Sequence, residues 1–229
     1  MTAEAMYTSD EYLKENPTWH TEDSPWKAKQ ILKIIGKNEL QPKSICEIGC
    51  GAGEILRQMF LQMSNDISFA GYEISSNAFE LCKQREADRL SYKLANLLED
   101  TSAFFDIVMA IDVFEHVEDC FGFLRSLKGK GIYKIFHIPL EMNIHGVLRP
   151  SRMLFARKKV GHIHYFCKDT ALAILKDVGY EIIDYFYTAG SVELSGMSPV
   201  NILRRIGFRI APDLTVRTFG GYSLMVLTK

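Results

Sequence analysis

Short runs rich in β-branched and aromatic residues alternate with longer segments of helical spacing from residue 44 onward. Such alternation is typical of βα units arranged around a mostly parallel sheet. We therefore predict an α/β fold with seven strands. Their expected ranges are 44–49, 68–74, 91–95, 106–112, 131–138, 181–188 and 221–228.

Four segments place apolar residues three and four positions apart, which predicts amphipathic helices. These segments are 26–36, 53–63, 75–90 and 168–180. In the last of them we expect Asp169 to cap the helix and Gly179 to end it. The apolar stripes are more typical of helix faces packed in a core than of a cofactor-binding face.

The composition excludes several classes of protein. A chain of 229 residues with 47% hydrophobic and 24% charged residues can form a full core and is unlike a disordered protein. Its net charge of −1 gives no general attraction to nucleic acid or acidic membranes, so no nucleic-acid partner is expected. The five cysteines contain no CxxC pair, which favours a reducing cytoplasm over a disulfide framework. No long apolar segment occurs, so we expect no export and no stable membrane association.

The stretch SICEIGCGAGEIL places Gly49, Gly51 and Gly53 directly after the first expected strand. A nicotinamide-binding turn has the pattern GxGxxG, and here the third glycine comes one residue early. A P-loop needs a lysine where Glu54 stands. Glu47, an acid within the strand, favours a ligand that carries positive charge. A turn that needs glycine only for its backbone conformation is the alternative, but three glycines at alternate positions make that the weaker interpretation.

Glu47 and the three glycines resemble the ExGxGxG signature of class I S-adenosylmethionine-dependent methyltransferases. Further landmarks follow in that family's order: Glu73 ends the second strand, Asn96 and Leu97 follow the third, and DIVMAIDVFEHVED resembles the fourth strand and its helix. The segment GHIHYFCKDTALAILKDVGYEIIDY resembles small-molecule methyltransferases related to ubiquinone-biosynthesis enzymes. The resemblance implies a Rossmann-like sheet with helices on both faces and an antiparallel last strand beside the sixth.

The resemblance also implies a site for S-adenosylmethionine. The glycine turn would approach the methionine part of the cofactor, and Glu47 would orient that turn. Glu73 would accept hydrogen bonds from both ribose hydroxyls. Asn96 would accept a bond from the adenine amino group, where the family usually has an acid. The expected cofactor-binding residues are Glu47, Gly49, Gly51, Gly53, Glu73, Ile74, Asn96, Leu97, Asp112 and Val113.

We expect a single methyltransferase domain over residues 1–229. Long excursions from a compact α/β core are often functional loops, and three regions lie outside the strand and helix alternation. The expected parts are an N-terminal helical cap (1–43), a cofactor-binding core (44–188), a lid insertion (139–167) and an insertion before the last strand (189–220).

Two histidines fall near the carboxyl ends of expected strands, where open α/β sheets bind their ligands. His137 is the first candidate for a general base and His116 the second, because an imidazole suits removal of a proton from a hydroxyl acceptor. An amine or carboxylate acceptor would need neither. His162 and His164 are expected to make structural hydrogen bonds. No compact HxxxH or mixed Cys/His spacing occurs, so no metal site is expected.

The segment HGVLRPSRMLFARKK carries five basic residues and no acid. Arg149 and Arg152 are the expected substrate-binding residues, because arginine forks suit anionic groups. The alternative is a solvated basic helix face. Farther along, SPVNILRRIGFRIAPDLTVR fits an amphipathic surface helix that touches a membrane or a partner. We favour an ordinary helix that packs on the core through Ile202, Leu203, Ile206 and Ile210.

These observations predict a cytoplasmic enzyme that transfers a methyl group from S-adenosylmethionine to an oxygen or nitrogen of a small, anionic metabolite. The main alternative is a catalytically inactive S-adenosylmethionine-binding partner or sensor. An NAD-dependent oxidoreductase is a more distant one. The sequence leaves the acceptor's identity and the oligomeric state open.

Overall fold

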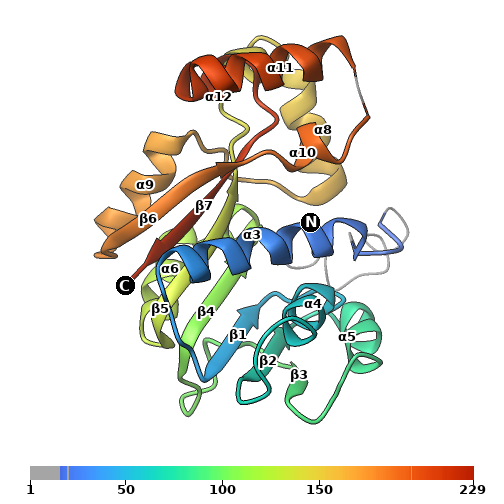
Figure 1. Ribbon diagram of the computed structural model, residues 1–229, viewed down its shortest axis with the longest axis vertical. Coiled ribbons are helices and arrows are strands. Elements are labelled where there is room, and N and C mark those ends of the chain that lie inside the picture. The colour runs from blue at the N-terminus through green and yellow to red at the C-terminus, as the bar shows by residue number, and fades with distance from the viewer. Residues whose placement is uncertain (1–15, 20, 197) are drawn as a thin grey trace.

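The computed structural model describes residues 16–19, 21–196 and 198–229. Its centre is a seven-stranded sheet in the order β3-β2-β1-β4-β5-β7-β6 (Figure 1). Neighbouring strands from β3 to β5 are parallel, whereas β7 is antiparallel to both β5 and β6. The strands are β1 (Ser44–Ile48), β2 (Ser68–Glu73), β3 (Leu90–Leu94), β4 (Phe105–Ile111), β5 (Gly131–Pro139), β6 (Ile182–Thr188) and β7 (Ser223–Thr228).

The observed sheet confirms the expected fold. Each predicted strand lies within two residues of its predicted bounds. The last strand is antiparallel and lies beside the sixth, as the resemblance implied. It also pairs with β5, so β7 is inserted between two strands that precede it in the chain.

Helices cover both faces of the sheet. Along β4, Ile107 and Met109 belong to one buried cluster, while Val108 and Ala110 belong to the other. The first cluster includes residues of α3 (Ser24–Lys37), α4 (Glu54–Phe60) and α5 (Ser76–Lys83). The second includes residues of α6 (Cys120–Lys128) and α9 (Lys168–Asp177). This arrangement explains why the central strands are apolar at consecutive positions.

The ends of α9 test the expected helix boundaries. Gly179 follows the helix with φ of 84°, as expected for a residue that ends it. The cap, however, is Cys167 rather than Asp169, which lies in the first turn. The side chains of Cys167 and Thr170 form the capping box, so the prediction for Asp169 was wrong by two positions.

Two groups of short helices lie beyond the carboxyl ends of the parallel strands (Figure 1). The group after β5 contains α7 (Ile144–Val147) and α8 (Pro150–Val160). The group between β6 and β7 contains α10 (Gly190–Glu193), α11 (Pro199–Ile210) and α12 (Pro212–Phe219). Short 3₁₀ turns, η1 (Thr21–Asp23) and η2 (Phe114–His116), precede α3 and α6. The two groups of helices therefore lie at the edge of the sheet where α/β proteins bind ligands.

The apolar stripe of α11 faces away from the core. Its four members are 46–78% exposed: Ile202, Leu203, Ile206 and Ile210. The opposite side of the helix holds the contacts, because Asn201 is buried and the Phe208 ring stacks on Tyr222 at 4.9 Å. The favoured prediction, in which this stripe packs on the core, was therefore wrong.

No helix among the described residues has the length and apolar character needed to cross a membrane.

Candidate functional site

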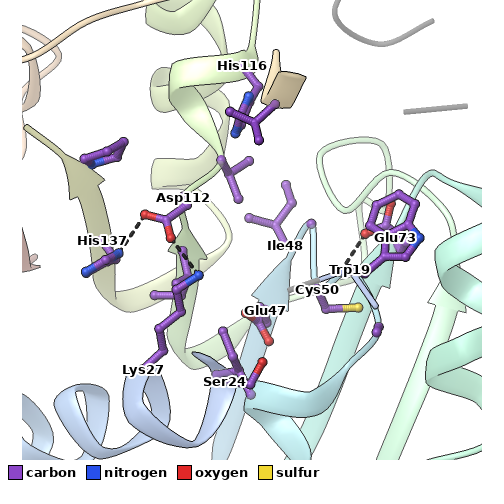
Figure 2. Close-up of a pocket in the computed structure, with 18 of the residues that line it drawn as sticks. Trp19, Ser24, Lys27, Glu47, Ile48, Cys50, Glu73, Asp112, His116 and His137 are labelled. Atoms are coloured by element: carbon purple, nitrogen blue, oxygen red, sulfur yellow. Dashed lines mark hydrogen bonds and ion pairs between the residues drawn. The ribbon is translucent and has the colours of Figure 1, made fainter. Parts of the chain in front are cut away.

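A cavity of about 1370 Å³ opens at the carboxyl ends of β1, β2, β4 and β5 (Figure 2). It is lined by both candidate bases, His116 and His137. It is also lined by all the expected cofactor-binding residues except Gly53: Glu47, Gly49, Gly51, Glu73, Ile74, Asn96, Leu97, Asp112 and Val113. The fold thus brings together residues that are up to 90 positions apart in the chain.

The glycine turn joins β1 to α4 through three left-handed residues. Gly49, Gly51 and Gly53 have φ values of 65°, 55° and 76°. A Cβ at Gly53 would lie 2.6 Å from the Tyr92 ring and 2.7 Å from Cys82 Cβ, so this glycine is needed for packing. At Gly51 the nearest atom would be Trp19 Cε3, at 3.8 Å. Gly51 is therefore the glycine whose missing side chain leaves room in the cavity.

This contrast predicts unequal effects of two alanine substitutions. Each replaces a glycine at positive φ, which costs about 1–2 kcal/mol. Gly53→Ala also overlaps Tyr92 and Cys82, which adds about 1–3 kcal/mol, whereas Gly51→Ala meets only an ordinary contact. Urea unfolding should therefore show a larger loss of stability for Gly53→Ala. Equal losses would mean that the turn is packed differently.

Glu73 ties the end of β2 to the glycine turn. Its Oε2 accepts the Gly51 N–H at 2.8 Å, and its Oε1 accepts the backbone N–H groups of Ile74 and Ser75. Burial raises the pKa of Glu73, and these three bonds oppose that rise. A carboxylate offers about four acceptor positions, so roughly one remains for a ligand, on Oε2. The structure leaves less capacity than the two ribose bonds expected from the resemblance.

Glu47 is a buried acid with an unused oxygen. Its side chain is 2% exposed, and Oε2 has no hydrogen-bond partner among the described residues. Burial raises its pKa, and the positive charge of Lys27 opposes the rise. A buried acceptor without a donor is costly, and a ligand with an N–H or ammonium group would satisfy it.

The loop after β3 forms another wall of the cavity. Leu97 is fully buried, and Asn96 is half-buried with its Oδ1 accepting the Leu98 N–H at 3.0 Å. The amide nitrogen of Asn96 donates to Glu99. Asn96 can still accept one further bond through its second lone pair, as an adenine amino group requires.

A charged network supports the end of β4. Asp112 has φ of 55°, an unusual conformation for a residue other than glycine. Its Oδ1 lies 2.6 Å from Nδ1 of His137 and its Oδ2 lies 2.9 Å from Nζ of Lys27 (Figure 2). The other ring nitrogen of His137 lies 2.8 Å from the Thr188 hydroxyl. Both nitrogens of His137 are therefore engaged, which suits a positioning residue better than a free base.

Comparison with known proteins gives a family for this arrangement. A sequence profile described as a methyltransferase domain matches residues 19–185, which include the glycine turn, Glu73 and Asp112. The chain belongs to this methyltransferase family. No curated protein matches it significantly.

Solved structures show that the methyltransferase domain has the class I fold. Magnesium protoporphyrin IX methyltransferase of Synechocystis PCC 6803, solved with S-adenosylhomocysteine, is 15% identical with a TM-score of 0.61, and the match covers 89% of this chain and 82% of that one. The N-methyltransferase NodS of Bradyrhizobium japonicum WM9 is 14% identical with a TM-score of 0.62, over 97% of each chain. The plantazolicin methyltransferase BpumL is 15% identical with a TM-score of 0.64, over 100% of this chain and 94% of that one.

Two residues of the methyltransferase domain's site were not singled out from the sequence. Lys27 reaches the site from α3, where its position matches an ordinary polar face of an amphipathic helix. Trp19 lines the cavity beside Gly51 (Figure 2). The only sequence signal for Trp19 was the aromatic stretch before α3, which did not indicate which ring would reach the site.

Three potential metal ligands of the methyltransferase domain lie together, and two of them, His116 and His162, line the cavity. Donor atoms of Glu115, His116 and His162 are all within 4.8 Å of one another, although the spacing in the sequence predicted no metal site. Glu115 is fully buried, and neither carboxylate oxygen has a hydrogen bond within the described part of the chain. Nδ1 of His162 lies 2.8 Å from Oε2 of Glu141. Burial and the neighbouring His162 lower the pKa of His116 to about 4, so its imidazole is neutral at pH 7.

Four further residues were singled out from the sequence: His162, His164, Arg149 and Arg152. Both histidines make hydrogen bonds, as expected, His164 through Nε2 to the Val117 carbonyl and His162 to Glu141, but His162 also lines the cavity. Arg149 caps α8 in an exposed position and is not among the residues that line the cavity. The side chain of Arg152 lies outside the described part of the structure. Among the residues that the structure describes, the arginine that lines the cavity is Arg204 of α11.

Proposed function

We propose that this chain transfers the methyl group of S-adenosylmethionine to an oxygen or nitrogen atom of a small molecule. The observation that carries the proposal is the contact at the cavity wall between Gly51, whose missing side chain leaves open space, and Glu73, which ends the neighbouring strand. The three solved structures named above support the donor, because all three contain S-adenosylhomocysteine.

The residues of this site fit the parts of the donor. Oε2 of Glu47 is a buried acceptor that the donor's ammonium group would satisfy. The remaining acceptor position of Glu73 suits a ribose hydroxyl, and Asn96 with Leu97 suits the adenine. In S-adenosylmethionine the methyl group is bonded to a sulfonium sulfur. When the methyl group is transferred, the rest of the donor leaves as a neutral thioether.

The work left to the protein is mainly orientation. Holding two reactants in line can lower a barrier by about 7–11 kcal/mol in favourable cases. We propose that His137 orients Asp112 rather than removing a proton, because both of its ring nitrogens are engaged. His116 is the other candidate to accept a proton from a hydroxyl acceptor when no cation occupies its ring, since it is neutral at pH 7 and lines the cavity.

The acceptor's charge has weaker support than its size. The anionic acceptor expected from Arg149 and Arg152 is not favoured by the exposed position of Arg149. Arg204 provides positive charge at the cavity, but its Nη2 already donates to the Phe219 carbonyl at 2.7 Å and its Nη1 to Asn201. The proposal is therefore for a small acceptor with a hydroxyl or amine group.

Incubation of the protein with methyl-labelled donor and fractionated metabolite pools tests the proposal. We expect label to appear in a small molecule with wild-type protein and to fall at least tenfold with Glu73→Ala at limiting donor, because donor binding is weakened. Glu80→Ala, at an exposed site on α5, is the matched control. A protein that binds S-adenosylhomocysteine but labels nothing would favour the inactive sensor.

A further inference from the structure

We propose that Glu115, His116 and His162 bind a divalent transition-metal cation, and that Glu141 orients His162 for this purpose. The proposal of the cation itself needs only the geometry of these side chains. Its role in catalysis, described below, rests on the proposed methyl transfer.

The carboxyl group of Glu115 lacks hydrogen-bond partners within the described residues. Its side chain is fully buried, yet neither oxygen has a hydrogen bond within the described part of the chain. Leaving a carboxyl group unsatisfied in the interior is costly, and proteins retain such groups mainly where a ligand or ion completes them. Nε2 of His116 lies 3.8 Å from Oε1 of Glu115. That separation is too long for a hydrogen bond but suits two ligands of one ion.

The backbone holds His162 beside His116. The α8 helix ends at Gly161, whose φ of 78° turns the chain back toward η2. The Glu115 carbonyl then accepts the backbone N–H groups of Ile163 and His164, each at 3.0 Å. These two bonds fix the imidazole of His162 beside that of His116, with ring centroids 4.7 Å apart.

His162 has a carboxylate partner, Glu141. Nδ1 of this ring lies 2.8 Å from a carboxylate oxygen of Glu141, which leaves Nε2 for a cation. A carboxylate behind a histidine is the usual support of a metal ligand, since it fixes the tautomer and raises the basicity of the ring. Glu141 comes two residues after the end of β5, so the sheet helps to position this support.

The donor set indicates the class of cation. Two imidazoles and one carboxylate suit zinc, manganese, iron or cobalt better than magnesium or calcium, which prefer oxygen ligands. Tetrahedral ligands at about 2.0–2.2 Å from zinc would lie about 3.3–3.6 Å apart, so the donors within 4.8 Å need to approach by about 1 Å. Three protein ligands leave at least one coordination position open.

The two imidazoles of this cluster adjoin the site proposed for the methyl donor. His116 and His162 line the same cavity as Gly51 and Glu73. A cation held by these imidazoles would therefore bind an oxygen of a molecule in the cavity and lower the pKa of a hydroxyl there, so that its proton leaves to solvent. The methyl group would then move from the donor's sulfur, which keeps the electron pair of the broken bond, to this oxygen. The site thus favours an oxygen acceptor over a nitrogen acceptor.

Titration of chelator-treated protein with Co²⁺, followed by visible absorption and calorimetry, tests the inference. We expect the wild-type protein to bind Co²⁺ and to lose at least tenfold in affinity on Glu115→Gln or His162→Gln. Glu141→Gln should weaken binding by about 10- to 100-fold, the usual effect of removing such a support. His164→Gln removes an imidazole from the same segment outside the cluster and should bind Co²⁺ like the wild type.

Titration of the same samples with S-adenosylhomocysteine separates the two proposals and shows that each variant is folded. Protein that binds S-adenosylhomocysteine but no Co²⁺ or Zn²⁺ would overturn the metal inference and leave the proposed function standing. Protein that binds Co²⁺ but no S-adenosylhomocysteine would overturn the proposed function and leave the metal inference standing. Equal Co²⁺ affinity in the wild type and in both ligand variants would also overturn the metal site.

Discussion

Replacement of Glu73 by alanine is expected to weaken the binding of S-adenosylhomocysteine by about ten- to hundredfold. The carboxylate has one acceptor position left on Oε2 and supports the Gly51 N–H with the same atom. Loss of a hydrogen bond to a charged acceptor costs about 1.5–3 kcal/mol, and each 1.4 kcal/mol is a factor of ten in affinity. Isothermal titration calorimetry measures the change directly.

Two controls make this result specific. Glu80→Ala removes an exposed acid from α5 and should leave the affinity unchanged. Glu73→Gln keeps the size of the side chain and one acceptor oxygen, so its affinity should lie between those of the wild type and the alanine variant. An alanine variant that is folded and binds with wild-type affinity would show that the ligand lies elsewhere.

Replacement of Lys27 by methionine should lower the free energy of unfolding by about 3 kcal/mol. Lys27 pairs with Asp112 at 2.9 Å and with Asp23 at 3.1 Å, and its side chain is 14% exposed. Removing one partner of a largely buried ion pair leaves the other charge uncompensated, which costs about 3–5 kcal/mol. We expect the lower value because Asp112 keeps its contact with His137. Urea unfolding gives the difference.

The pH dependence of this effect follows from the two pKa shifts. Burial opposes ionisation of Asp112, but the charges of His137 and Lys27 outweigh burial and hold its pKa well below 3.8. The contribution of Asp112 is therefore present above pH 3.8 and lost as the pH falls further. Burial likewise opposes the charge of Lys27, but Asp112 and Asp23 raise its pKa, so its contribution is present below pH 10.5 and lost at higher pH.

The matched control is Lys29→Met, because Lys29 is an exposed lysine of the same helix. It should change the unfolding free energy by less than about 0.5 kcal/mol. A double-mutant cycle of Lys27→Met with Asp112→Asn should give a coupling energy of about 0.5–3 kcal/mol. Additive effects would show that the ion pair does not form in solution.

The sheet was predictable because its central strands are buried on both faces. Runs such as FDIVMAI in β4 are apolar at consecutive positions, and glycine turns and polar residues mark their ends. The order of the strands does not follow from these local patterns. Only the antiparallel last strand beside the sixth came from the resemblance, and the pairing of β7 with β6 confirms it.

The cavity was only partly predictable. His116 and His137 were singled out because the carboxyl edge of a parallel sheet is a known location for ligands, whereas Glu73 and Asp112 came from the family resemblance; all four line the cavity. Lys27, His162 and Glu141 come from α3, from the chain after α8 and from the residue after Leu140, and their contacts depend on tertiary packing over long sequence separations. No local pattern in the sequence distinguishes them from surface residues.

The exposed stripe of α11 has a similar explanation. Spacing identifies an apolar face of a helix but not the direction in which that face points. Here the Tyr222 hydroxyl donates to the Arg204 carbonyl and Arg204 donates to the Phe219 carbonyl. These polar contacts hold the other face of the helix against the domain.

Calorimetric titration of the wild-type protein with S-adenosylhomocysteine, and separately with NADH, tests the central claim most directly. The quenching or enhancement of tryptophan fluorescence provides a second readout, because Trp19 lies beside Gly51. The account predicts saturable binding of S-adenosylhomocysteine, competition by S-adenosylmethionine and no binding of NADH. A folded protein that binds NADH, or that binds neither S-adenosyl compound, would contradict it.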